Sequence, residues 1–309
     1  MLETVTTEID AMNAETGAKE EPRDFWKRIP FVLVHLSLIF LYFTGISATS
    51  MLVCGSLFFV RMFAITGGYH RYFSHRSYKT SRIFQFILGY LGATAAQRGP
   101  IWWASHHRHH HRHSDTPEDV HPPKIYGFWW SHVGWIMSTE YLRARYDLMR
   151  DFMKFPEIVW LDRFHLLAPI SLAIAVFALG SFLQISYPNL GVTSWQMLIC
   201  GFFLSTVLVY HCTFAVNSIT HMFGKQRFVT GDDSRNSFLI ALFTLGEGWH
   251  NNHHRYPGSE RQGFYWWEID ISHYVLVILS WFGIVWDLRV PPDRIYREAE
   301  SGVRTAHAE

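Results

Sequence analysis

Residues 48–75, ATSMLVCGSLFFVRMFAITGGYHRYFSH, hold the pattern from which the rest of the chain is interpreted. Their first part, residues 48–67, is apolar with Arg61 as its only charged residue. It has about the twenty residues that a helix needs to cross a bilayer. His70 and His75 follow directly after it. This order predicts a membrane-spanning helix that carries histidines at its end.

Three further apolar stretches of similar length lie at residues 29–46, 166–185 and 195–216, and none of them holds a charged residue. The connectors between the four stretches are alternately uncharged and basic along the chain. We therefore predict an all-α integral membrane protein with four transmembrane helices, rather than a soluble protein with buried helices. Arg61, near the end of its stretch, is expected to snorkel to the surface or to pair.

Basic residues gather on one side of these helices. The connectors at residues 47–50 and 186–194 carry no charge. The other side holds Lys27, Arg28, Arg71, Arg76, Lys79, Arg82 and the arginine-rich segment at residues 98–163. Basic connectors stay cytoplasmic, so both termini are predicted inside, in a bacterial plasma membrane or a eukaryotic endoplasmic reticulum.

The remaining segments surround a single predicted membrane domain at residues 25–290. Residues 1–24 are polar and are predicted to be a disordered tail, not a signal peptide, because the apolar run starts late. Residues 83–96 and 271–286 are apolar but shorter or interrupted. They are expected to lie at the membrane interface or to form part of a cytosolic helical cap. Residues 291–309 are expected to be a C-terminal tail.

The composition of the 309 residues excludes several classes of protein. A net charge of +1 gives no basic face for nucleic acid. Cys54, Cys200 and Cys212 all lie in apolar runs, which excludes a disulfide framework and a cysteine zinc site. The unusual feature is the 19 histidines, seven of which fall between His106 and His121.

The histidines form three clusters with spacings that suit metal binding. His70 and His75 are five residues apart, about 140° around an ideal helix, so they converge only if the helix ends or unwinds near Gly67-Gly68. A His-x-x-His-His pattern places three rings on one helical face. In the second cluster this pattern fits two registers: His107, His110 and His111, or His106, His109 and His110. Periodicity alone does not choose between them.

The third cluster repeats the pattern without ambiguity as His250, His253 and His254. His221 lies just past the fourth apolar run, with Asn217 one turn before it. The isolated histidines are interpreted as packing or hydrogen-bonding residues: His35, His132, His165, His211 and His273.

Ligand type and number indicate the metal. Imidazole suits iron, copper and zinc, and three clusters exceed the four ligands of a structural zinc. Cysteines for an iron–sulfur cluster and Glu-x-x-His pairs for a carboxylate-bridged site are absent from the sequence. We expect two metal ions that bind and reduce oxygen. A metal transporter would need such ligands inside the spanning helices, where only His35 and His211 are found.

Around these clusters the sequence resembles the membrane fatty acyl desaturases of the stearoyl-CoA delta-9 type, over roughly residues 60–290. The resemblance rests on five segments: GGYHRYFSHRSYK (67–79), WA-x-x-HRHHH-x-x-SD (103–115), GFWWSHVGW (127–135), NSITH (217–221) and GEGWHNNHH (246–254). It implies oxygen-dependent formation of a cis double bond, at delta-9, in a saturated acyl chain carried on coenzyme A. A carrier protein or a lipid is the alternative carrier. A membrane di-iron fatty acid hydroxylase or alkane monooxygenase is the alternative.

The resemblance also implies the site residues. Two Fe2+ ions would be held by His70, His75, His107, His110, His111, His221, His250, His253 and His254, and by Asn217 through water. No catalytic residue beyond these ligands is implied. Gln97, Trp103 and Thr213 would line the bend of the acyl tunnel. Ser105 departs from a family arginine that contacts coenzyme A, and Arg98 from a neighbouring asparagine.

Carboxylates are expected to orient the imidazole rings, and the candidates are Asp115, Asp119, Asp232, Asp233 and Glu247. The sequence holds no flavin- or nucleotide-binding motif, so electrons are expected from a separate protein that is cytochrome b5-like or ferredoxin-like. The basic cytoplasmic face suits an acidic partner of this kind.

Overall fold

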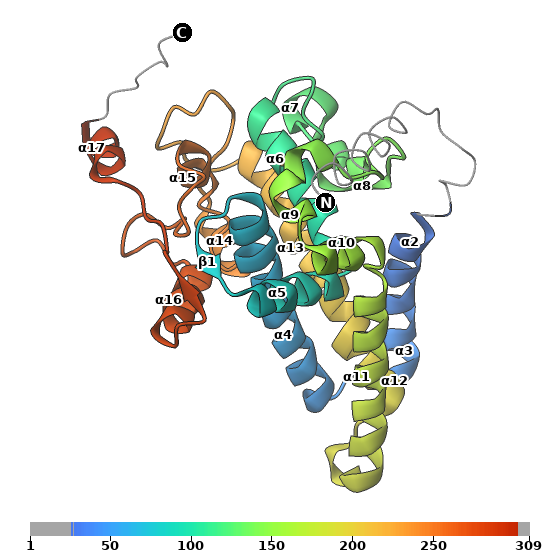
Figure 1. The fold of residues 1–309 in the computed structure, drawn as a ribbon. Coiled ribbons are helices and arrows are strands. Elements are labelled where there is room, and N and C mark those ends of the chain that lie inside the picture. The colour runs from blue at the N-terminus through green and yellow to red at the C-terminus, as the bar shows by residue number, and fades with distance from the viewer. Residues whose placement is uncertain (1–25, 27, 302–309) are drawn as a thin grey trace.

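The computed structural model describes residue 26 and residues 28–301, so the tail predicted at residues 1–24 lies outside the described residues. The described chain is mostly helical. Its long apolar helices project to one side, and shorter helices gather on the other side (Figure 1).

Three helical runs are long and apolar enough to cross a membrane: Ala48–Ser74, Leu167–Ser186 and Ser194–Ile219. They are built from α4 (Ala48–Phe63) and η4 (Ala64–Ser74), from α11 (Leu167–Ser186), and from α12 (Ser194–Gln196), η8 (Met197–Leu204) and α13 (Ser205–Ser218). These runs coincide with three of the four predicted spans. The fourth prediction falls on the shorter apolar run Ile29–Thr44, made of α2 (Ile29–Leu36), η3 (Ser37–Phe40) and α3 (Leu41–Thr44).

Local sequence signals explain where these helices begin. Ser47 and Ser50 form a capping box at the start of α4, in which each side chain accepts from the other's backbone N–H. The Thr193 side chain caps α12 in a similar way by accepting from the Gln196 backbone. Gly45, with φ of 68°, ends α3 before the tight turn into α4.

Arg61 of α4 does not behave as predicted, because it neither snorkels nor pairs with an acid. It is only 1% exposed and points into the helix bundle. Its five guanidinium N–H groups contact neutral oxygens only: Leu57 O, Thr94 O, Phe202 O, Ser205 Oγ and Thr206 Oγ1. A buried cation is tolerated when every donor has a partner. Arg61 thereby joins α4 to η8 and α13.

The other side of the molecule is assembled from shorter helices. Its larger ones are α5 (Arg82–Thr94), α6 (Pro100–His113), α10 (Pro156–Arg163) and α16 (Ile271–Trp281). The smaller ones are α7 (Pro123–Tyr126), η5 (Trp130–Gly134), α8 (Trp135–Met137), η6 (Tyr146–Met149), α9 (Arg150–Met153), η9 (Ile219–His221), α14 (Phe238–Phe243) and α15 (His250–Arg255). The 3-10 helix η7 (Pro188–Leu190) lies at the opposite end, after α11.

Two further features were not predicted. Strands β1 (Lys79–Thr80) and β2 (Val285–Trp286) pair antiparallel, Lys79 with Trp286, and so join segments from the two ends of the domain. Residues 293–301, assigned to a C-terminal tail, form helix α17 (Asp293–Ser301). This helix folds because Ile295 is fully buried with Phe228 and Phe264.

Candidate metal centre and adjoining cavity

Nine histidines lie in two groups in which ring nitrogens converge. The first group consists of His70, His75, His107, His111 and His253. The second consists of His110, His221, His250 and His254. Within each group, one nitrogen of every side chain lies within 4.8 Å of the others. The structure therefore brings together all nine histidines that the resemblance implied, as sets of five and four.

The pair His70 and His75 is aligned by the π-helix η4. The backbone N–H of His75 donates to the carbonyl of His70 at 3.2 Å, which is the i→i+5 bond of π-helical structure. The wider turn brings residues five apart onto one face, and the two ring centroids are 4.9 Å apart. The helix was expected to end or unwind at Gly67-Gly68. It continues instead as a π-helix that begins at Ala64.

Helix α6 contributes histidines to both groups: His107 and His111 to the first and His110 to the second. His106 and His109, which belong only to the competing register, lie outside both groups. His106 donates from Nε2 to the carbonyl of Arg143 at 3.0 Å, and His109 pairs with the carbonyl of Glu118 at 2.8 Å. Both rings are therefore turned toward backbone carbonyls and away from the two groups.

Carboxylates hold Nδ1 of four rings: His70 contacts Glu247, His110 contacts Asp119 at 2.9 Å, His221 contacts Asp115 at 2.8 Å, and His254 contacts Asp232 at 2.6 Å. A neutral imidazole that donates through Nδ1 presents a lone pair at Nε2. Of the five candidate acids, Asp233 alone lies away from the rings, because it pairs with Lys124 Nζ at 3.0 Å.

Electrostatics favour neutral rings at most of these histidines, and ionised acids. At His110, burial would lower the pKa, but the neighbouring Asp119 raises it. Burial, followed by the neighbouring imidazoles, lowers the pKa of His107 and His111 well below the ordinary value. Burial alone would raise the pKa of Asp232, but the attraction of His254 and hydrogen bonds lower it below its usual range. Neutral imidazoles beside ionised carboxylates are the forms that bind a cation.

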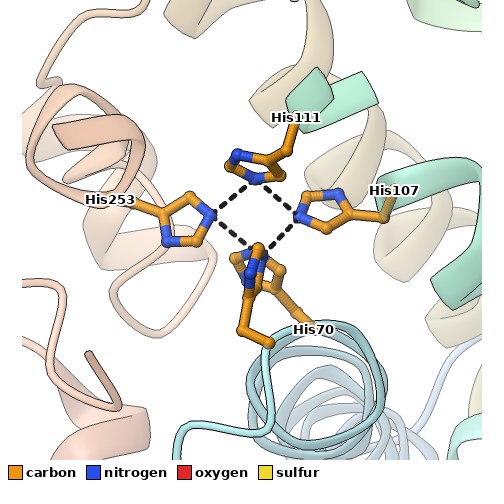
Figure 2. Close-up of side chains that lie close together, drawn as sticks. His70, His107, His111 and His253 are labelled. Atoms are coloured by element: carbon orange, nitrogen blue, oxygen red, sulfur yellow. Dashed lines mark hydrogen bonds between the residues drawn. The ribbon is translucent and has the colours of Figure 1, made fainter. Parts of the chain in front are cut away.

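Several ring nitrogens of the two groups face one another or lack a partner. Nε2 of His253 lies 2.9 Å from Nε2 of His111, which lies 3.0 Å from Nε2 of His107 (Figure 2). Nε2 atoms of His110 and His254 are buried without a hydrogen-bond partner among the described residues. Buried polar atoms are normally satisfied. A cation within each group would satisfy these lone pairs, so the donor set fits two metal ions.

A cavity of about 840 Å³ adjoins the first group. His107, Asn217 and the three predicted bend residues all line it. Gln97 holds the bend residues together, because its Nε2 donates to Thr213 Oγ1 at 3.0 Å and its Oε1 accepts from Trp103 Nε1 at 3.2 Å. Phe202 and Phe203 of η8 add apolar side chains to its wall.

A second cavity of about 30 Å³ continues toward both histidine groups. Trp103, His107, Thr213 and Asn217 line both cavities, and the smaller one reaches His70 and His250. Its volume is close to that of one water molecule. An elongated apolar ligand in the large cavity would therefore pass directly beside the space in front of the metal ligands.

Comparison with known proteins agrees with this geometry. Residues 22–283, most of the chain, match the sequence model described as fatty acid desaturase. The chain belongs to the fatty acid desaturase family. It is therefore an oxidoreductase that desaturates fatty acyl chains.

Relatives of this desaturase differ in the carrier and bond position that their names give. It is 34% identical to the sn-2 palmitoyl-lipid 9-desaturase of Nostoc sp., over 91% of this chain and 95% of that protein. It is 36% identical to the acyl-CoA 5-desaturase of Anemone leveillei, over 80% of this chain and 72% of that protein. It is 37% identical to the sn-1 stearoyl-lipid 9-desaturase of a Synechocystis species, over 74% of this chain and 68% of that protein.

The desaturase also uses residues that sequence reasoning did not assign to the site. Arg71, counted among the cytoplasmic basic residues, is 1% exposed and bonds to Glu247 and Asp270. Gln262 donates to Glu247 at 2.8 Å. Both therefore fix the carboxylate that orients His70. Arg71 adjoins a histidine in the sequence, but no spacing rule indicates which way its side chain points.

The histidines interpreted as packing residues are hydrogen-bonded away from the two groups. His211 lies between His35 and His132, with nitrogen–nitrogen distances of 3.2 and 3.1 Å. His165 contacts the carbonyl of Asp162, and His273 contacts Glu260. These contacts agree with the expected packing and hydrogen-bonding roles.

Proposed function

We propose that this desaturase uses O2 and two Fe2+ ions to introduce a cis double bond, at delta-9, into a saturated acyl chain. The observation that carries the proposal is the convergence of nine histidine side chains beside a mostly apolar cavity. Histidine groups without an adjoining cavity would fit a site that only stores metal ions. Here one wall of the cavity includes a ligand of the first group, His107.

The nine histidines would hold the iron, five around one ion and four around the other, with Asn217 contributing through water. Bound iron supplies the chemistry of O2 reduction. The protein's residues keep the imidazoles neutral, orient them through carboxylates and leave positions open for oxygen. The balanced reaction removes two hydrogens from adjacent methylenes. These hydrogens, two electrons and two protons reduce O2 to two molecules of water.

The cavity would select the methylene pair. Gln97, Trp103 and Thr213 form a hydrogen-bonded wall at the bend, and that wall would fix which carbons lie beside His107. A bend in the chain favours a cis product, and the apolar lining keeps water from the reacting carbons.

Acyl-CoA is the proposed carrier, and an acyl-lipid is the second candidate, because relatives carry both names. Ser105, which replaces the family's arginine, is fully buried. It donates to Trp102 O at 2.8 Å and accepts from the Arg145 backbone at 3.1 Å. It is therefore not exposed to contact coenzyme A, so other residues would have to bind that carrier.

The proposed setting is a membrane with four spans, a cytosolic cap and both termini cytoplasmic. Run Ile29–Thr44 would be the fourth span. Its outward residues support contact with lipid, since Tyr42 and Phe43 are 88% and 72% exposed. Electrons would come from a separate protein, cytochrome b5-like or ferredoxin-like, with no flavin or nucleotide bound to this chain.

The test is expression of the full chain in a host whose lipids carry saturated acyl chains. We expect new cis-monounsaturated chains, and about two irons per purified chain. The His253→Ala variant, which removes a ligand of the first group, should give neither the product nor full iron. Hydroxylated chains without double bonds would favour the hydroxylase alternative, and firmly bound zinc in active enzyme would refute the iron assignment.

A further inference from the structure

Arg98 is a partly buried cation of the cavity wall that makes few hydrogen bonds. It lines the large cavity, and the one hydrogen bond of its guanidinium among the described residues is from Nη1 to the carbonyl of Leu142, at 3.1 Å. The guanidinium carbon lies 4.9 Å from the ring centroid of Trp102. Burial lowers the pKa of Arg98, as expected for a cation in poorly solvated surroundings.

Two fully buried arginines, Arg61 and Arg71, have complete sets of partners. Arg61 uses all of its donors on neutral oxygens, and Arg71 bonds to Glu247, Asp270 and the carbonyl of Glu260. Leaving the donors of a buried cation without partners is unfavourable. Arg98 differs from both because it is only partly buried, and its remaining donors belong to a residue of the cavity wall.

A second donor without a partner belongs to the same part of the cavity. Trp135 is 7% exposed and lines the cavity, and its Nε1 is buried with no partner among the described residues. Its ring stacks on Trp102, with centroids 5.8 Å apart. No carboxylate is found among the described residues that line the cavity. Two unused donors without an acid indicate a ligand group that accepts hydrogen bonds, such as a carbonyl oxygen.

The segment that carries Arg98 is held firmly. Ala96 and Arg98 both adopt left-handed backbone conformations, with φ of 57° and 67°. Their carbonyls accept hydrogen bonds from the hydroxyls of Tyr210 (2.9 Å) and Tyr69 (3.0 Å). Strain of this kind persists only where the surroundings enforce it, and it is frequent at binding sites.

On the basis of the proposed function, we infer that Arg98, together with Trp135, binds the carbonyl group that joins the acyl chain to its carrier. This carbonyl is common to thioesters and glycerol esters. Gln97, the next residue in the chain, holds the bend through Trp103 and Thr213. Because the anchor and the bend occupy consecutive residues, the number of methylenes between the carbonyl and the iron is fixed. Arg98 is thus a positioning residue that determines the double-bond position from the carbonyl end.

The test measures the double-bond position in tetradecanoyl, hexadecanoyl and octadecanoyl chains after expression of the full protein. Wild type should give one position, counted from the carbonyl, for all three lengths. Arg98→Met keeps the aliphatic stem and removes the donors. It should lower product formation about tenfold, as for a lost hydrogen bond to a charged group, and should spread the product over neighbouring positions. Trp135→Phe should act in the same direction but less strongly.

Matched controls separate this role from a loss of folding. Arg163→Met removes an exposed arginine that lies away from the cavity. Trp130→Phe removes an indole N–H that already has a partner, the carbonyl of Val120. Both should keep the wild-type position and yield. Arg98→Lys keeps the charge and should restore a single position, and the iron content of every variant should equal that of wild type.

A comparison of two carriers tests whether Arg98 binds the acyl carbonyl or a group of the carrier. Host membranes, which supply the reductant, are incubated with stearoyl-CoA or with carbon-13-labelled dipalmitoyl phosphatidylcholine. Arg98→Met should reduce turnover of every carrier that wild type accepts and should shift the bond position. Lower turnover with an unchanged position would overturn the inference, because the bound group would then belong to the carrier. Unchanged rate and position would also overturn it. Absence of any double bond from wild type would instead refute the proposed function.

Discussion

At the residue scale, the site depends on which histidines of α6 face the metals. His110 is buried against Asp119, whereas His109 is half-exposed beside the Glu118 carbonyl. We expect His110→Ala to abolish turnover and to lower iron content, because it removes a proposed ligand. His109→Ala is the matched control and should keep most of the activity. An equal loss of activity from the two changes would show that the ligands are assigned to the wrong histidines of α6.

The carboxylates behind the rings give a second prediction at this scale. Asp232→Asn removes the charge that orients His254, and the loss of such a partner typically lowers metal affinity by about 10- to 100-fold. Iron retention during dialysis against a chelator measures this change. The neighbouring Asp233→Asn should have little effect, because Asp233 pairs with the exposed Lys124. Loss of iron from the Asp233 variant would contradict the assigned roles.

At the element scale, the π-helix η4 is held in place by close contact with α5. A Cβ at Gly92 would lie 2.3 Å from the ring of Tyr69, a fully buried residue of η4. Gly92→Ala should therefore destabilise the protein by about 1–3 kcal/mol, because overpacking displaces that ring. Thermal unfolding in detergent measures the change, and activity should fall with it because His70 follows Tyr69.

Gly55→Ala in α4 is the control for this prediction. A Cβ at Gly55 would meet nothing within 4 Å, and alanine favours a helix more than glycine. The variant should unfold at the wild-type temperature or slightly above it. If both glycine variants unfolded at the wild-type temperature, the contact between α5 and η4 would not support the site.

At the scale of the whole molecule, the four-span arrangement predicts where each connector lies. Reporter fusions at Ser138 and Glu309 should indicate the cytoplasm, and a fusion at Asn189 should indicate the opposite side. Asn189 lies in η7, directly after α11, and Ser138 follows α8 among the short helices that surround the histidines. A cytoplasmic signal at Asn189 would refute this topology. A non-cytoplasmic signal at Ser138 would place the metal centre on the wrong face for a cytosolic electron donor.

The sequence alone determined features that depend on local order. Apolar length located three membrane-type helices, because a span needs a continuous run. The His-x-x-His-His spacing identified the clusters, because residues three and four apart share a helical face. Periodicity could not choose the register of α6, since both registers satisfy it. The resemblance selected one, and that register is the one in which the structure brings the rings together.

Only the tertiary structure decided how these parts meet. His253 lies with His70 and His75, whereas its neighbours His250 and His254 lie with His221. The burial of Arg61 and the pairing of Arg71 follow from hydrogen-bond partners more than 100 residues away. Such contacts form because buried polar groups must find partners in the folded chain, and that requirement joins residues that no local pattern relates.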